Sequence, residues 1–266
     1  MTTDLNLNGV ALSAAVPSAL VLDVRRQLVG LRRHSRLPIP GRAGAWTYTE
    51  EPGDRDISVD ISVIGDDLEL RRTAVRDLAY WVDIGEVSRL IIDDEPDRFH
   101  DVILAAADQA TERLLHGKAT LRFSANPFAL AVAISTRALS APTSPTSSSF
   151  AETSEVYAEP VVEITNTVGG TDLTGLTFAV NGYALTWSGV VGAGDILTIS
   201  SLSDTVTLGA NADVDLVGAY DPLDVDMADV SGEFPLIFAG ANPWSITYTG
   251  ADAGVTIALA WRERFR

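Results

Sequence analysis

The stretch from Ser140 to Ser149 reads Ser-Ala-Pro-Thr-Ser-Pro-Thr-Ser-Ser-Ser and contains no large apolar or charged side chain. Segments rich in proline and serine bury too little apolar surface to fold alone, which predicts a linker or an exposed crossing. The chain before it is mixed and contains one clear helical pattern, whereas the chain after it is almost purely β in pattern. We therefore expect an N-terminal domain over residues 1–140, a linker over 141–151 and a C-terminal domain over 152–266.

The first half contains a strong strand pattern followed by a strong helix pattern. Apolar and polar residues alternate over 57–63, as in a strand with one buried face. Apolar residues then recur at helical spacing over 68–84, with Asp66 and Asp67 before them and Gly85 after them as cap signals. The solvent side of this helix is expected to carry Arg71, Arg72, Arg76 and Asp77.

Further strands are expected around this helix. Residues 87–92 run into the turn-forming run Asp93–Asp97, and residues 99–106 form the expected hairpin partner. Residues 118–125 alternate again, while 111–115 fit either a strand or a short helix. The first half is therefore predicted to be α+β with an antiparallel sheet.

The segment Arg32–Gly44 is polar and broken by Pro and Gly, so it is expected to be a mobile loop or an arm that orders against a partner. Arginines are dense around it. A ring of identical subunits could pair this basic patch with the acidic face of the neighbouring copy, and an exposed basic loop explains it equally well. The arginines are Arg25, Arg26, Arg32, Arg33, Arg36 and Arg42.

The second half reads as strand-turn-strand throughout. Its strongest signal is Asn181-Gly182 between the alternating segments 176–180 and 183–187, which predicts a hairpin with a type I′ turn. Short strands at this spacing predict an antiparallel β-sandwich. The other expected strands are 161–165, 196–200, 206–208, 236–238, 245–248 and 255–261.

The net charge is −17, and the two halves share it unequally. Residues 141–266 carry 3 basic against 16 acidic residues. This excess of negative charge disfavours nucleic-acid or anionic-membrane binding by the second half. The chain has no cysteine and no basic segment before Arg25, and its apolar stretch Val10–Val24 is interrupted by polar residues. We expect no disulfide, no cleavable signal peptide and no membrane insertion.

None of the candidate chemical motifs points to an enzyme. Gly189–Asp195 resembles a phosphate loop only superficially, because strands flank it on both sides, and a β-turn is expected. The acidic run Asp221–Asp229 fits a solvated loop better than a cation site, although the sequence leaves the cation open. His34, His100 and His116 lack partners at metal-ligand spacing. We expect no catalytic residue, cofactor or metal.

Three tryptophans of the second half suggest an alternative function. Trp187, Trp244 and Trp261 could form a platform on which sugar rings stack. Trp187 and Trp261 lie in alternating strands, where core packing is the simpler explanation. Trp244 follows Asn242-Pro243 and is expected to be the more exposed of the three. The alternative function is therefore a module that binds host cell-surface carbohydrate.

Several short motifs, in this order, resemble the distal tail protein family of phages with long non-contractile tails. In the first half they surround a Pro-Gly-Arg-x-Gly-aromatic segment, an Asp-x-Pro turn and a closing residue-Pro-Phe signature, where Asn126 replaces the usual Asp. In the second half they lie in turns and in the closing strand. The segments are Pro40–Trp46, Asp56–Val63, Leu78–Trp81, Leu90–Phe99, Lys118–Phe128, Gly194–Ile199, Phe234–Leu236, Gly240–Trp244 and Ala260–Phe265.

The resemblance implies a structural role in the virion. Residues 1–140 would form a ring-making domain, with a hexamer as the expected assembly. The ring would join the tail tube protein to the tip, baseplate hub or receptor-binding proteins. The second half would be a galectin-like or carbohydrate-module-like β-sandwich. Assembly would take place in the host cytoplasm, and the family provides no catalytic residue.

Overall fold

The structure is a computed structural model of the 266-residue chain. It describes residues 3–28, 30, 32–38, 45–65, 67–83, 85, 87–107, 111–112, 116–141, 143–166, 171–209, 230–250 and 255–265. The chain divides into two compact units, residues 1–132 and residues 133–265. Each unit has its own hydrophobic core.

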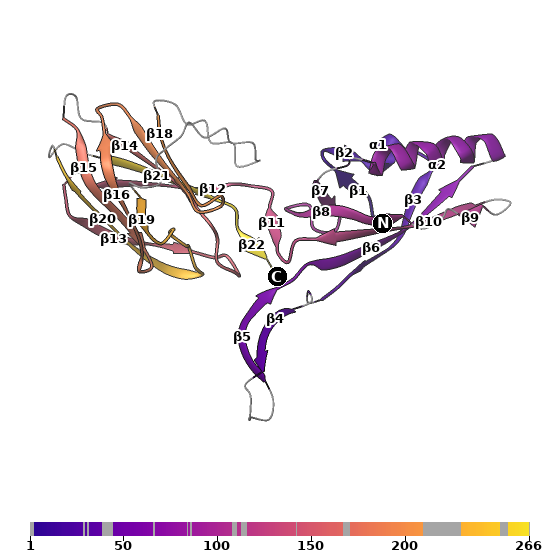
Figure 1. The fold of residues 1–266 in the computed structure, drawn as a ribbon. Helices are drawn as coiled ribbons and strands as arrows, with labels where there is room; N and C mark the ends of the chain where they lie inside the picture. The colour runs from indigo at the N-terminus through magenta and orange to yellow at the C-terminus, as the bar shows by residue number, and fades with distance from the viewer. Residues whose placement is uncertain are drawn as a thin grey trace. The chain divides into compact units, whose positions relative to one another are not determined.

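The first unit is an antiparallel sheet with helices, as the sequence predicts (Figure 1). The strand order of the main sheet is β2-β1-β7-β8-β10-β6-β3, with β9 paired to β10 and β11 paired to β8. Strands β4 and β5 form a separate two-stranded ribbon. The bounds are β1 (Leu5–Leu7), β2 (Val10–Ala11), α1 (Leu12–Ala15), β3 (Ala19–Arg26), β4 (Arg32–Pro38), β5 (Ala45–Pro52), β6 (Arg55–Ile64), α2 (Leu68–Val82), β7 (Ser88–Ile92), β8 (Arg98–Ala107), β9 (Thr111–Glu112), β10 (His116–Ala125) and β11 (Ala129–Ala131).

The predicted helix and the strand before it are both confirmed. Helix α2 begins after Asp67, whose side chain accepts a hydrogen bond from the Leu70 N–H at 2.8 Å, and Gly85 after the helix has a φ of +67°. The helix places Leu78 and Trp81 in the core that the alternating apolar residues of β6 also line. Burial of this face against the sheet is what holds the helix in place.

One residue of this helix lies where the sequence did not predict it. Arg71 was expected to face solvent, but its side chain is buried. Its stem lies against Gly65, where an added Cβ would come within 2.7 Å of the Arg71 Cγ, and its Nε donates to the Asp67 carbonyl at 3.1 Å. The long aliphatic stem is therefore buried while the guanidinium bonds to backbone of its own helix turn.

The segment Arg32–Gly44, expected to be a loop or an arm, is partly a strand. Residues 32–38 pair with 45–52 as β4 and β5, and Figure 1 shows this ribbon extending away from the rest of the first unit. The sequence also gave no signal for β1, α1 and β3, although β3 pairs with β6 over most of its length. The ambiguous residues 111 and 112 form the short strand β9.

The second unit is a β-sandwich, as predicted, made of two five-stranded antiparallel sheets. Their orders are β12-β21-β14-β17-β18 and β13-β20-β15-β16-β19. Both sheets contribute to one core. The bounds are β12 (Ser135–Ala141), β13 (Thr146–Glu152), β14 (Val161–Asn166), β15 (Leu173–Val180), β16 (Tyr183–Val191), β17 (Ile196–Ser200), β18 (Thr205–Gly209), β19 (Val230–Gly232), β20 (Gly240–Thr249), β21 (Val255–Trp261) and β22 (Arg264–Phe265).

The linker expected over 141–151 is not found there. Strand β12 is the terminal strand of one sheet and β13 is the terminal strand of the other, so the Ser/Pro-rich stretch crosses between the two sheets inside the sandwich. The Ser144 Oγ donates to the Tyr248 carbonyl at 2.7 Å, which ties this crossing to β20.

Two turn predictions for this unit are confirmed. Asn181 and Gly182 both have positive φ, 54° and 86°, as a type I′ turn between β15 and β16 requires. The glycine-rich segment 189–195 is the end of β16 and a turn into β17, and not a phosphate loop. The strand expected over 236–238 is only an isolated bridge between Ile237 and Ala158.

Candidate interaction surfaces

The tryptophan platform of the alternative function is not present, and the core packing expected for Trp187 and Trp261 is confirmed. Trp187, Trp244 and Trp261 are all buried in the sandwich core, each with at most 5% of its surface exposed. The prediction that Trp244 is exposed was wrong because Asn242-Pro243-Trp244 lies within β20 and not in a turn. Trp244 faces Ser148 of β13 and Val180 of β15 in the ladder. These rings fill the core and cannot stack on a ligand at the surface.

A shallow trough of about 360 Å³ lies on the other sheet of the second unit. It is bordered by β12, β21 and β14, where the small side chains of Ala138 and Ala258 lie beside Glu163. No aromatic ring is among the residues that line it, so this trough offers no stacking surface for a sugar either.

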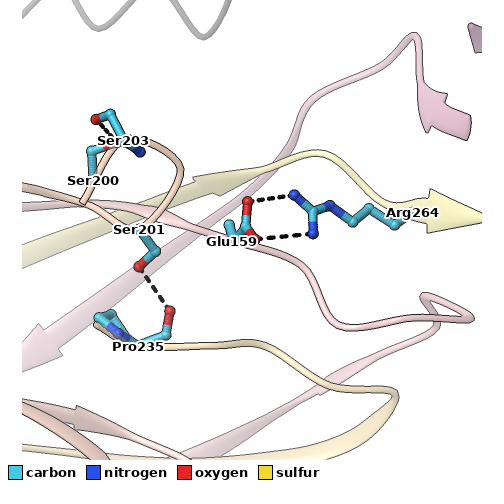
Figure 2. Close-up of polar contacts among 6 residues, drawn as sticks. All are labelled: Glu159, Ser200, Ser201, Ser203, Pro235 and Arg264. Atoms are coloured by element: carbon cyan, nitrogen blue, oxygen red, sulfur yellow. Dashed lines mark hydrogen bonds and ion pairs between the residues drawn. The ribbon is translucent and has the colours of Figure 1, made fainter. Parts of the chain in front are cut away.

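The second unit also contains an ion pair, which is shown in Figure 2. The Arg264 guanidinium forms two hydrogen bonds with the Glu159 carboxylate, one of them 3.0 Å long, and its Cζ lies 5.1 Å from the centre of the Tyr157 ring. Nearby, the Ser201 Oγ donates to the Pro235 carbonyl at 2.7 Å. A paired and stacked guanidinium of this kind fixes chain segments to each other, which is a structural role.

The basic patch predicted in the first unit is partly neutralised within the chain. The Arg25 Nη2 lies 2.9 Å from the Asp60 Oδ1, and the Arg26 Nη2 lies 2.5 Å from the Asp94 Oδ1. A hydrogen bond from Thr120, together with the charge of Arg25, lowers the pKa of Asp60 despite partial desolvation. Arg32 is exposed on β4. The side chains of Arg33 and Arg36, and all of Arg42, lie outside the described residues.

The sequence did not predict a pocket that forms where the core of the first unit ends. In β8 the side chains of Arg98, His100 and Val102 point to one face of the sheet, and Val102 is a core residue. On β3 and β6, Arg26 lies opposite the buried Ile57. The row of core residues therefore ends in cationic side chains, which line a pocket of about 190 Å³ together with Arg55 and Glu95.

His100 is the ionisable group that the fold perturbs most clearly in this pocket. Only 7% of its surface is exposed. Burial, followed by the positive charges of Arg26, Arg55 and Arg98, lowers its pKa to about 4. His100 is therefore neutral at pH 7, and the pocket has a net positive potential at its position.

The first unit also exposes apolar side chains at a sheet edge. Strand β3 ends the main sheet, and Leu20 and Leu22 on it are 39% and 53% exposed. A terminal strand with apolar residues is a typical place for another chain to pair or pack. On helix α2, Leu70 and Tyr80 are exposed to 58% and 87%.

Several candidate site residues of the sequence lie outside the described part of the chain. The acidic run Asp221–Asp229 and the side chains of His34 and His116 lie outside the described residues. Within the described part of the chain, no three His, Asp or Glu side chains are grouped as metal ligands would be. No helix in that part is both long and apolar enough to cross a membrane.

Residues 19–125, from the start of β3 to the end of β10, match the model of the phage tail protein RIFT-related domain. This part of the first unit is therefore similar to that domain family. No curated protein is significantly similar to the chain in sequence.

Solved structures extend the comparison to the whole chain. The Dit (gp 19.1) protein of phage SPP1, described as a paradigm of the hub adsorption apparatus in phages that infect Gram-positive bacteria, superposes with a TM-score of 0.72 at 16% identity over 100% of both chains. The chain therefore has the distal tail protein fold, which confirms the resemblance seen in its motifs. One chain of the phage P2 baseplate, in its activated conformation with Ca, superposes with a TM-score of 0.44 at 10% identity, over 97% of this chain and 98% of that chain.

Proposed function

We propose that the chain is a hub protein that forms a closed, hexameric ring at the distal end of the tail tube. The ring connects the tube protein to the tip, baseplate hub or receptor-binding proteins. The observation that carries this proposal is the full-length match with SPP1 Dit, because both units correspond and not the tail domain alone.

The surface of the first unit is suited to such an assembly. A ring of identical copies needs two different patches that meet head to tail. The β3 edge provides one candidate patch, because it combines a terminal strand with Leu20 and Leu22. The basic side chains Arg25 and Arg26 contribute less than the sequence suggested, since each already contacts a carboxylate of its own chain.

Negative-stain electron microscopy of the purified full-length chain, with light scattering for mass, tests the ring. We expect closed rings and a mass of six copies of the 28.3-kDa chain. A chain that stays monomeric at high concentration, also in the presence of the tube protein, contradicts the proposal.

A pair of variants tests which unit makes the ring. Leu22→Glu places a charge on the β3 edge, and Val190→Glu places the same charge on β16 of the second unit, at a residue with similar exposure, 49%. We expect Leu22→Glu to lower the ring fraction at least tenfold, an effect of about 1.4 kcal/mol, while Val190→Glu leaves it unchanged. Equal ring fractions for the two variants would exclude the β3 edge from the ring contact.

A further inference from the structure

The pocket at the end of the first unit's core has more cationic than anionic side chains. Arg26, Arg55 and Arg98 line it together with His100, and Glu95 is the acidic residue in the lining. Asp94 beside Arg26 and Asp97, 3.9 Å from the Arg98 Nε, reduce the excess of positive charge. The three arginines and three carboxylates carry no formal net charge together, but at His100 the positive charges of the arginines outweigh the negative charge of Asp94. A ligand with one negative charge therefore suits the pocket, whereas a doubly charged phosphate would be repelled more strongly by the three carboxylates.

Two nitrogen atoms of these lining residues are buried and have no hydrogen-bond partner among the described residues. They are the Arg26 Nε and the His100 Nδ1. A buried polar atom without a partner costs free energy, so each such atom needs an explanation. One hydrogen-bond acceptor bound in the pocket would explain both atoms, because Arg26 and His100 line the same cavity.

The shape of the pocket also selects for a small group. Its volume of about 190 Å³ is below the range of sites for drug-sized ligands. Ile57, which is 2% exposed, adds apolar surface to the lining beside the arginines. A planar carboxylate on a short aliphatic stem matches this arrangement, because guanidinium groups pair with carboxylates in two parallel hydrogen bonds.

We propose that the pocket formed by Arg26, Arg55, Arg98 and His100 binds a carboxylate group. The group is supplied either by an acidic side chain of a protein that contacts this face or by a small free carboxylate. The site does not depend on the ring, since every residue that lines it belongs to the first unit of one chain.

His100 provides a direct readout, because a carboxylate close to an imidazole favours the protonated ring and raises its pKa. At pH 6 the unliganded His100 is neutral, since its pKa is about 4. The full-length protein is titrated at pH 6 with sodium acetate or with hexaglutamate while NMR follows the imidazole Cε1–H signals. The chain has three histidines, so the variants His34→Gln and His116→Gln assign the signals.

A bound carboxylate is expected to raise the pKa of His100 by about 1 to 2 units, which moves its Cε1–H signal downfield at pH 6. If hexaglutamate acts at a lower carboxylate concentration than acetate, the natural ligand is an acidic protein segment. If acetate acts equally well, it is a small free carboxylate. Sodium chloride at the same ionic strength controls for screening.

The variant Arg55→Gln tests the pocket, with Arg76→Gln on the exposed face of α2 as the matched control. We expect Arg55→Gln to weaken the response at least tenfold and Arg76→Gln to leave it unchanged. If Arg55→Gln fails to fold, Arg98→Gln takes its place, and the wild-type titration decides in either case. A His100 signal that stays fixed up to about 100 mM carboxylate, or that moves equally with chloride, overturns the proposal.

Discussion

The His100 side chain is buried in the folded chain and hydrated in the unfolded chain. In the folded chain it ends a row of core-facing residues on β8 and is surrounded by arginines, so protonation would put a positive charge into a buried and already positive place. In the unfolded chain the imidazole is hydrated and takes a proton near its ordinary pKa of about 6.5. This difference makes stability depend on pH.

The dependence has a definite sign and window. As the pH falls below about 6.5, the unfolded chain binds a proton that the folded chain does not bind until about pH 4. Stability therefore decreases through this window. Between pH 7 and pH 5 we expect a loss from His100 of about 2 kcal/mol. His100→Gln should lack this loss, as measured by urea unfolding at several pH values above the isoelectric point near 4.4.

Tyr183→Phe is a suitable control for that experiment, because it alters a side chain of the second unit and adds no group that titrates in this range. It should follow the wild-type pH dependence. Identical curves for His100→Gln and the wild type between pH 7 and pH 5 would show that His100 ionises in the folded chain as freely as in water.

The surroundings of single side chains were harder to predict from the sequence than the local strand and turn patterns. Trp244 was expected in a turn because it follows Asn-Pro, but its strand β20 pairs on both sides and turns the ring into the core. His100 gave no signal, since neither Arg26 nor Arg55 is near it along the chain. Both environments depend on strand register, which brings distant residues together and which a single sequence does not specify.

At the scale of elements, the hairpin of β15 and β16 is the best case of local chemistry that dictates structure. Asn181 and Gly182 provide the two positive φ angles, and the Asn181 side chain also donates to the Leu236 carbonyl at 2.9 Å. The turn thus closes the hairpin and holds the neighbouring segment. Local signals of this strength survive in the fold because sheet twist favours the same turn.

Replacing the glycine of that turn, Gly182, isolates the contribution of its positive φ to stability. An added Cβ at Gly182 meets no atom within 4 Å, so Gly182→Ala introduces only the strain of a positive φ. We expect a loss of about 1 kcal/mol in the free energy of unfolding. Gly209→Ala on β18 is the matched control, since that position is equally open but its φ is not positive. Equal effects on thermal unfolding would contradict the φ argument.

Elements were predictable from sequence where their pattern was strong and were missed where pairing alone decides. Helix α2 and strands β6 and β10 have periodic apolar faces and were found. The predicted linker over 141–151 covers most of β13, because the only buried apolar residue of this strand is Phe150, and β12 was not predicted, because its only buried apolar residue is Ala141. As terminal strands they rely on backbone hydrogen bonds to β21 and β20, which every residue type except proline can donate.

At the scale of the whole molecule, charge opposes the assembly that we propose. Each copy carries −17, and the second half carries 16 of the 36 acidic residues with only 3 basic ones. Six such chains in one ring repel each other. The arginines that were expected to offset this repulsion between copies are in part already paired within the chain, as Arg25 with Asp60 and Arg26 with Asp94.

Salt should therefore promote ring formation. Raising the ionic strength from 0.01 M to 0.15 M shortens the screening length from about 30 Å to about 8 Å, which weakens the repulsion between copies but leaves apolar contacts at the β3 edge intact. We expect the ring fraction in light scattering to rise over this range. If arginine–carboxylate pairs between copies held the ring instead, the same salt would screen them and the ring fraction would fall. The sign of the response thus separates an apolar contact from an ionic one, and a fall would return the basic patch of the first unit to the centre of the assembly.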